Sequence, residues 1–298
     1  MKNALIDILG TQYPVIQGPM RFISLGKMAA DVSKYGGFGQ IAASGLTPQR
    51  LRKELKEAQN LTDKAFGVNF PIYRPEIEEL IDVAIEEGVK TVTTSAGNPE
   101  KFINKIKNAG LKVLHKVSTV EMARKAEDAG VDGIIATGFE AGGHVGRDEI
   151  TTFCLIPQLV KNLGIPIVAA GGIAQARQIK AVFSLGADGV EVGTRFLATK
   201  ECPVPDYFKQ MILKAKSDST ILIRRGALPM RVLNNMAAQR ILILDNAREN
   251  ETKINELIDS LYVSDDEQNS ILPCGQVAVM IDELMTIEEV MSNLFNGI

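Results

Sequence analysis

The chain has 298 residues, a formal net charge of −3, 45% hydrophobic residues and 23% charged residues. This is an ordinary composition for a soluble globular protein, and the interspersed charges form neither a nucleic-acid-binding stripe nor a polybasic membrane patch. No apolar run reaches the roughly 18 residues of a membrane span, and the first residues lack the pattern of a signal peptide. Cys154, Cys202 and Cys274 are too few and too widely spaced for a disulfide framework or a zinc site, which fits a cytoplasmic protein.

Short β-branched runs alternate with helical stretches from residue 12 to about 200. The sequence predicts eight strands, which begin near Tyr13, Gly37, Phe66, Lys90, Lys112, Asp132, Ile165 and Gly189. Several of these are nearly continuous apolar runs, as is typical of parallel strands buried on both faces.

The helices between these strands carry start and stop signals. Thr47 followed by Pro48 predicts a helix start, Ser118 with Glu121 fits a capping box, and glycines such as Gly130 end helices and lead into strands. Eight such repeats favour a (β/α)8 TIM barrel of the α/β class. The alternative is a doubly wound open sheet, which normally carries G-x-G-x-x-G after its first strand; residues 17–20 do not match that fingerprint.

The chain after the barrel looks different. We expect a barrel over residues 1–205, and a smaller helical subdomain without strands over residues 206–270 that covers the substrate. Residues 271–298 are expected to form helices that pack back on the barrel.

Sites in such barrels form at the carboxyl ends of the strands. Two adjacent glycine-rich ends, Ala170-Gly171-Gly172 after the seventh strand and Gly193-Thr194 after the eighth, suit a phosphate group held by backbone N–H groups. The alternative is that these glycines only make tight turns.

Polar side chains end two other strands. Asn69 ends the third strand, where it either binds a cofactor or forms a turn. Lys116 ends the fifth strand, and a lysine there is costly unless it meets an anion, such as a phosphate or the electron-rich edge of a flavin. Its neighbour His115 points to the opposite face, where we expect a structural role.

Residues 139–146, Phe-Glu-Ala-Gly-Gly-His-Val-Gly, follow the sixth strand. A loop of small residues lets a flat ligand approach the backbone, and His144 can exchange protons near neutral pH. Taken alone, the loop is equally compatible with a packing role for His144. Glu140 is more simply interpreted as a carboxylate that bonds to backbone groups.

Five segments together make the chain resemble the FMN-dependent nitronate monooxygenase family, formerly called 2-nitropropane dioxygenases. This family also includes NADH:quinone reductases and flavin-type enoyl-acyl-carrier-protein reductases. The matching segments are residues 13–20, 66–69, 140–146, 169–174 and 193–196, in family order.

The resemblance implies a role for each site residue. Backbone groups of Pro19, Met20 and Arg21 would contact the FMN, Asn69 and Lys116 would bind its ring or chain, and Gly142 and Gly143 would line the isoalloxazine. Its phosphate would be held by Ala170, Gly171, Gly172, Gly193 and Thr194. His144 would be the catalytic residue.

The resemblance implies oxidation of alkyl nitronates by O2 to carbonyl compounds and nitrite. The alternative is an NAD(P)H-dependent flavin reductase that acts on a quinone or an enoyl-acyl-carrier-protein. A third hypothesis is a flavin-binding barrel that does not catalyse a reaction. We expect a small-molecule substrate and neither a metal, a nucleic acid nor a membrane as partner. A homodimer is left open.

Overall fold

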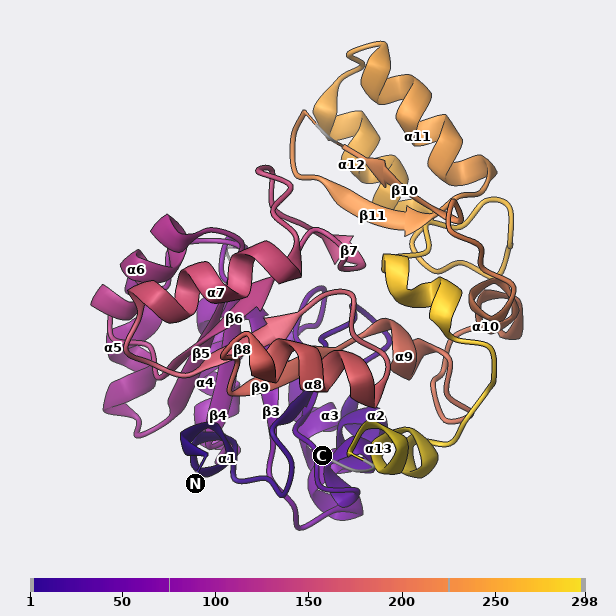
Figure 1. The fold of residues 1–298 in the computed structure, drawn as a ribbon. Helices are drawn as coiled ribbons and strands as arrows, with labels where there is room; N and C mark the ends of the chain where they lie inside the picture. The colour runs from indigo at the N-terminus through magenta and orange to yellow at the C-terminus, as the bar shows by residue number, and fades with distance from the viewer. Residues whose placement is uncertain (1–2, 75, 225, 296–298) are drawn as a thin grey trace.

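In a computed structural model, residues 3–74, 76–224 and 226–295 are described, and they form a parallel barrel with a cap above one end (Figure 1). The barrel strands are β1 (Val15–Gln17), β2 (Gly39–Ala42), β3 (Phe66–Pro71), β4 (Thr91–Ser95), β5 (Lys112–Val117), β6 (Gly133–Thr137), β8 (Ile167–Ala170) and β9 (Gly189–Val192). All eight predicted strands are present.

The eight strands follow chain order around the barrel. They pair in the order β1-β9-β8-β6-β5-β4-β3-β2. Two backbone hydrogen bonds close the ring, from Gln17 N to the Phe38 carbonyl at 2.9 Å and from Phe38 N to the Val15 carbonyl at 2.8 Å. The predicted (β/α)8 barrel is therefore confirmed, and the open doubly wound sheet is excluded.

Helices surround the strands, and one short helix closes the amino-terminal end. Leu5 and Leu9 of α1 (Ala4–Leu9) are buried in one cluster with Ile16, Phe38 and Val168 of the barrel interior. The outer helices are α2 (Gly26–Lys34), α3 (Pro48–Leu61), α4 (Ile77–Glu86), α5 (Glu100–Asn108), α6 (Val120–Asp128), α7 (Thr152–Asn162) and α8 (Ala176–Ser184), with a short α9 (Thr194–Leu197) after β9. With the amino-terminal end closed, the carboxyl end is left for a ligand.

The helix caps follow local chemistry. Thr47 caps α3 by accepting a hydrogen bond from Arg50 N, with Pro48 in the first turn as expected. The capping box expected from Ser118 and Glu121 is wrong, because Thr119 is the N-cap of α6 and accepts the bond from Met122 N, a residue whose side chain cannot bond back. Either hydroxyl can serve this role, so sequence alone does not separate the two positions.

The segment after the barrel is not purely helical, contrary to expectation. After α10 (Asp206–Leu213), the strands β10 (Thr220–Ile223) and β11 (Met230–Leu233) form an antiparallel pair, followed by α11 (Met236–Asn246) and α12 (Glu251–Ser260). We call residues 220–271 the cap. It has its own apolar cluster, which includes Ile223, Met230, Val232, Ile241, Ile254 and Ile258.

The cap is joined to the barrel by a strand from the barrel's own loop. β7 (Gly143–His144) pairs with β11, with Gly143 opposite Arg231 and His144 opposite Met230. The chain then returns to the barrel through a 3₁₀ helix, η1 (Gln276–Met280), and ends in α13 (Ile287–Phe295), which lies beside α2 (Figure 1). No helix in the described ranges is long and apolar enough to cross a bilayer.

Candidate active site at the carboxyl end of the barrel

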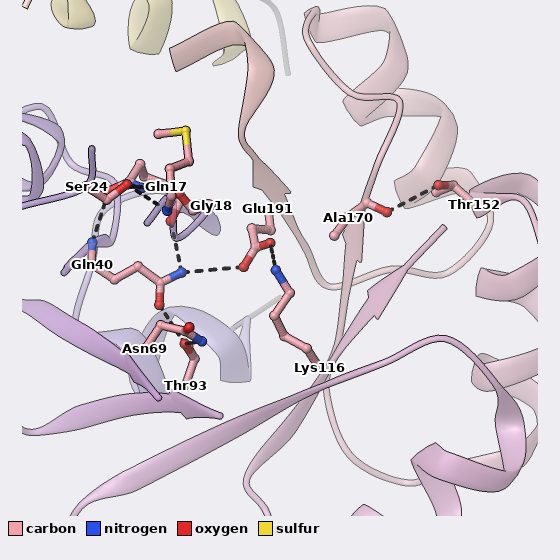
Figure 2. Close-up of polar contacts among 11 residues, drawn as sticks. Gln17, Gly18, Ser24, Gln40, Asn69, Thr93, Lys116, Thr152, Ala170 and Glu191 are labelled. Atoms are coloured by element: carbon pink, nitrogen blue, oxygen red, sulfur yellow. Dashed lines mark hydrogen bonds and ion pairs between the residues drawn. The ribbon is translucent and has the colours of Figure 1, made fainter. Parts of the chain in front are cut away.

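A continuous hydrogen-bond network occupies the carboxyl end of the barrel (Figure 2). Asn69, which is 5% exposed, donates to Thr93 Oγ1 at 2.8 Å, and Thr93 Oγ1 donates to Gln40 Oε1 at 2.6 Å. Gln40 Nε2 in turn donates to the Gln17 carbonyl at 2.9 Å and lies 3.4 Å from Glu191 Oε2. Side chains of β2, β3, β4 and β9 and a backbone carbonyl of β1 thus hold one another in place.

Lys116 meets an anion of the protein itself. Its Nζ lies 2.5 Å from Glu191 Oε1, and the Lys116 and Glu191 side chains are 20% and 5% exposed. The expectation that Lys116 is paired is met, although the partner is a carboxylate on β9. Sequence reasoning missed Glu191, Gln17 and Gln40 because it searched the residues after each strand. The available signal was a polar residue inside an otherwise apolar strand.

The first loop of the barrel, residues 18–24, is held by the Gln17 side chain at the end of β1. The Gln17 amide donates to the Gly18 carbonyl and to Ser24 Oγ, and Ser24 Oγ accepts from Met20 N at 3.0 Å. The Met20 carbonyl accepts from Ile23 N and Ser24 N. Both polar backbone groups of Met20 are therefore engaged within the loop, which leaves its side chain and the neighbouring Pro19 to meet a ligand.

The Arg21 side chain points to the cap. It forms an ion pair with Asp259 of α12, and its guanidinium carbon lies 4.6 Å from the Phe22 ring centre and 5.3 Å from the Tyr262 ring centre. The loop after β1 is therefore connected to the cap by a charged and aromatic contact.

The turns after β8 and β9 lie on neighbouring strands, and we call them, with the open space beside Gly193, the glycine hollow. Gly171 and Gly172 have φ values of +99° and +75°, which favour glycine, and the two strands that they and Gly193 follow are neighbours. A Cβ atom added at Gly193 would meet no atom within 4 Å. Among the described residues, no acceptor is recorded for the backbone N–H of Gly172 or Thr194.

These features fit the phosphate of a mononucleotide. Unpaired backbone N–H groups next to open space suit an anion. Thr194 Oγ1 accepts a hydrogen bond from Gly275 N at 3.0 Å, and its hydroxyl also forms a side-chain hydrogen bond with Cys274. Ala170 lies beneath the hollow at the end of β8.

Residues 274–276 of the C-terminal segment lie against the loop after β6 and the turn after β9. The sequence analysis assigned these residues no role in the site. Gln276 N donates to the Glu140 carbonyl at 3.0 Å, and a Cβ atom at Gly142 would lie 2.6 Å from Gly275 N. The Gly142 backbone therefore packs directly on the tail. Burial raises the pKa of the adjacent Cys274 thiol to about 12, so this cysteine is protonated at neutral pH.

Glu140 holds the loop rather than reacting. Its carboxylate accepts hydrogen bonds from Thr152 N at 2.9 Å and from Thr152 Oγ1 at 3.1 Å at the start of α7. The single Thr152 hydroxyl proton is shared between Glu140 and the Gly171 carbonyl, which lies 2.9 Å from Oγ1. Thr152 Oγ1 also lies 3.3 Å from the Ala170 carbonyl (Figure 2). The structural interpretation of Glu140 agrees with these contacts.

The two histidines lie in different environments. His115 is 2% exposed, its Nδ1 lies 2.8 Å from Thr94 Oγ1, and burial lowers its pKa to about 4. The His144 side chain on β7 reaches solvent, but neighbouring protein atoms desolvate part of its ring. This desolvation, followed by the positive charges of Arg21 and Arg74, lowers the pKa of His144 to about 4. His144 is therefore uncharged at neutral pH.

Comparison with known proteins agrees with this arrangement. The sequence model of the nitronate monooxygenase family matches residues 2–297. A "probable nitronate monooxygenase" of Staphylococcus saprophyticus is 34% identical over 267 residues, which cover 74% of this chain and 75% of that protein.

Two further relatives extend the comparison. A Rhodococcus jostii protein named (3aS,4S,5R,7aS)-5-hydroxy-7a-methyl-1-oxo-octahydro-1H-indene-4-carboxyl-CoA dehydrogenase is 34% identical over 235 residues, or 78% of this chain. The match spans 66% of that relative, just under two thirds of its length. The solved structure of FabK from Thermotoga maritima has a TM-score of 0.94 at 36% identity and covers 99% of this chain and 95% of its own. The chain is an oxidoreductase that belongs to the nitronate monooxygenase family, a family of flavin enzymes.

Proposed function

We propose that the protein is an FMN-dependent nitronate monooxygenase, which oxidises alkyl nitronates with O2 to carbonyl compounds and nitrite. One observation carries the proposal. In a chain matched by this family over residues 2–297, the glycine hollow, Asn69, Lys116 and the uncharged His144 all lie at the carboxyl end of one barrel.

The hollow after β8 and β9 would hold the FMN phosphate through the N–H groups of Gly172 and Thr194. Asn69 and Lys116 would bind the ring or ribityl chain, with Pro19, Met20 and Arg21 on one side and Gly142 and Gly143 on the other. When bound, the flavin ring supplies reversible transfer of electrons between the substrate and oxygen.

His144 would receive the substrate. A nitronate is an anion, and the positive charges of Arg21 and Arg74 act at His144. An uncharged imidazole can donate one hydrogen bond to a nitronate oxygen without releasing its proton. His144 would thus orient the anion, whereas Arg21 and Arg74 are already paired with Asp259 and Glu76.

Anaerobic reduction of the FMN-loaded protein tests this proposal. Ethylnitronate should bleach the visible flavin absorbance in the absence of oxygen, and admitting oxygen should restore it with release of nitrite. Fast bleaching by NADH or NADPH, with none by nitronate, would reject the monooxygenase. A protein that cannot be loaded with FMN at all would reject both flavin-dependent candidates.

A second candidate is NAD(P)H-dependent reduction of a quinone or an enoyl thioester. It is favoured by the Rhodococcus relative, whose name describes a dehydrogenase of a carboxyl-CoA, which is a thioester. The same anaerobic assay separates the candidates, because only this one requires a nicotinamide to reduce the flavin. Reoxidation by a quinone or by an enoyl-CoA would then identify the acceptor.

A further inference from the structure

Glu191 is a buried carboxylate in an apolar strand. It is 6% exposed and lies between Val190 and Val192 of β9. Burying a charge is costly unless it is paired and hydrogen-bonded. Both of its oxygens have partners, because Oε1 lies 2.5 Å from Lys116 Nζ and Oε2 lies 3.4 Å from Gln40 Nε2.

These partners are themselves fixed. Gln40 is held by the Gln17 carbonyl and by Thr93 Oγ1, and Thr93 also accepts a hydrogen bond from Asn69 (Figure 2). The network therefore runs without a break from Asn69 to Lys116. These are the two side chains proposed to meet the flavin, so their positions depend on each other through Glu191 and Gln40.

The pair also sets the charge at this end of the barrel. The Lys116 side chain is more exposed than that of Glu191, so the ammonium group is the member of the pair that a ligand can reach. A lone ammonium group beside a flavin would favour its reduced form, which carries more negative charge. Because the Glu191 carboxylate lies 2.5 Å from the Lys116 ammonium group, the two opposite charges largely cancel at the position of the flavin.

We infer that Glu191 tunes the flavin, by neutralising Lys116 and holding its side chain, and so keeps the reduction potential below the value that an unpaired lysine would give. This inference rests on the proposed binding of FMN. Glu191 acts through Lys116 and is a positioning residue.

Redox titration of the FMN-loaded proteins against a dye of known potential tests the inference. In Glu191→Gln the preference for reduced over oxidised FMN should rise about tenfold, which is about +30 mV for a two-electron couple. The double variant Lys116→Met/Glu191→Gln is again neutral and should return to the wild-type potential. The inference is overturned if Glu191→Gln keeps the wild-type potential, or if the double variant keeps the shift of Glu191→Gln.

A matched control is Asp132→Asn, which also removes a carboxylate that is paired with lysine side chains. Asp132 pairs with Lys107 and Lys112 before β6, at the opposite end of the barrel, and its variant should leave the reduction potential unchanged.

If Glu191→Gln fails to fold, the effect of the Glu191 carboxylate is measured by comparing Lys116→Met with the double variant. Lys116→Met should then have the lower potential, and equal potentials contradict the inference. Failure of the wild type to bind FMN would instead refute the proposed function, and this inference with it.

Discussion

At the scale of single residues, the two histidines show how location decides chemistry. Both have a pKa lowered to about 4, His115 through burial, and His144 through desolvation and two nearby arginines. His115 lies on β5 with its ring against Thr94 of β4, whereas His144 lies on the strand that joins the barrel loop to the cap. Only His144 is placed to meet a ligand.

We predict that His144→Ala binds FMN with nearly wild-type affinity but loses about 10²- to 10⁴-fold in turnover, as expected when one hydrogen-bonding catalytic group is removed. The measurement is kcat with a saturating nitronate, alongside fluorimetric titration of FMN. His115→Asn, assayed at pH 8, is the matched control and should retain turnover. Wild-type turnover in His144→Ala would contradict the catalytic role.

His115 gives a prediction for stability. In the unfolded chain His115 has its ordinary pKa of 6.5, so it binds a proton below that pH. In the folded chain the pKa of His115 is about 4, so the same proton binds only near pH 4. The free energy of unfolding therefore falls as the pH drops through this window, by about 2 kcal/mol at pH 5. His115→Asn has no histidine to titrate and so lacks this loss. On going from pH 7.5 to pH 5, the free energy of unfolding measured with urea should therefore rise by about 2 kcal/mol in the variant relative to the wild type. An equal difference at both pH values would refute it.

At the scale of elements, the sequence predicted what local patterns control. Near-continuous apolar runs located the barrel strands, whereas the phosphate site predicted from the glycines after β8 and β9 stays a prediction. The sequence did not predict β10 and β11, because each strand has only four residues and β11 pairs with β7, which lies far away in the chain. Glu191 was missed because an isolated acid in a strand signals a site only when its partner Lys116 is known.

The loop after β9 gives a test of the hollow. Gly193 has a φ of −110°, which any residue can adopt, and its added Cβ would meet no atom within 4 Å. Gly193→Ala should therefore fold with an unchanged free energy of unfolding, or one higher by up to about 1 kcal/mol. If the FMN phosphate fills this space, overpacking should raise the Kd for FMN about 5- to 150-fold.

The control for this change is Gly164→Ala. The nearest atom to its added Cβ is Glu127 Oε1 at 3.7 Å, and it lies between α7 and β8, before the strand rather than after it. It should alter neither stability nor FMN affinity. Unchanged FMN affinity in Gly193→Ala would place the phosphate elsewhere.

At the scale of the whole molecule, the site joins parts that are otherwise separate. The barrel and the cap have different apolar clusters. The barrel and the cap meet around the site through the β7–β11 pair and the Arg21–Asp259 ion pair, and the C-terminal tail joins the barrel there through the bond from Gly275 N to Thr194. A ligand that touches the loops of β1, β8 and β9 therefore lies where all three parts converge, and its binding should stabilise the folded chain as one unit.

We accordingly predict that FMN at about 100 times its Kd stabilises the flavin-free protein by about 2.7 kcal/mol, which raises the melting temperature of a chain of this length by about 4 °C. Riboflavin lacks the phosphate and should give a smaller shift at the same concentration, because the N–H groups of Gly172 and Thr194 stay unpaired. In Gly193→Ala the shift by FMN should shrink toward that by riboflavin, while the riboflavin shift is unchanged. Equal shifts by the two flavins in the wild type would mean that the hollow does not bind phosphate.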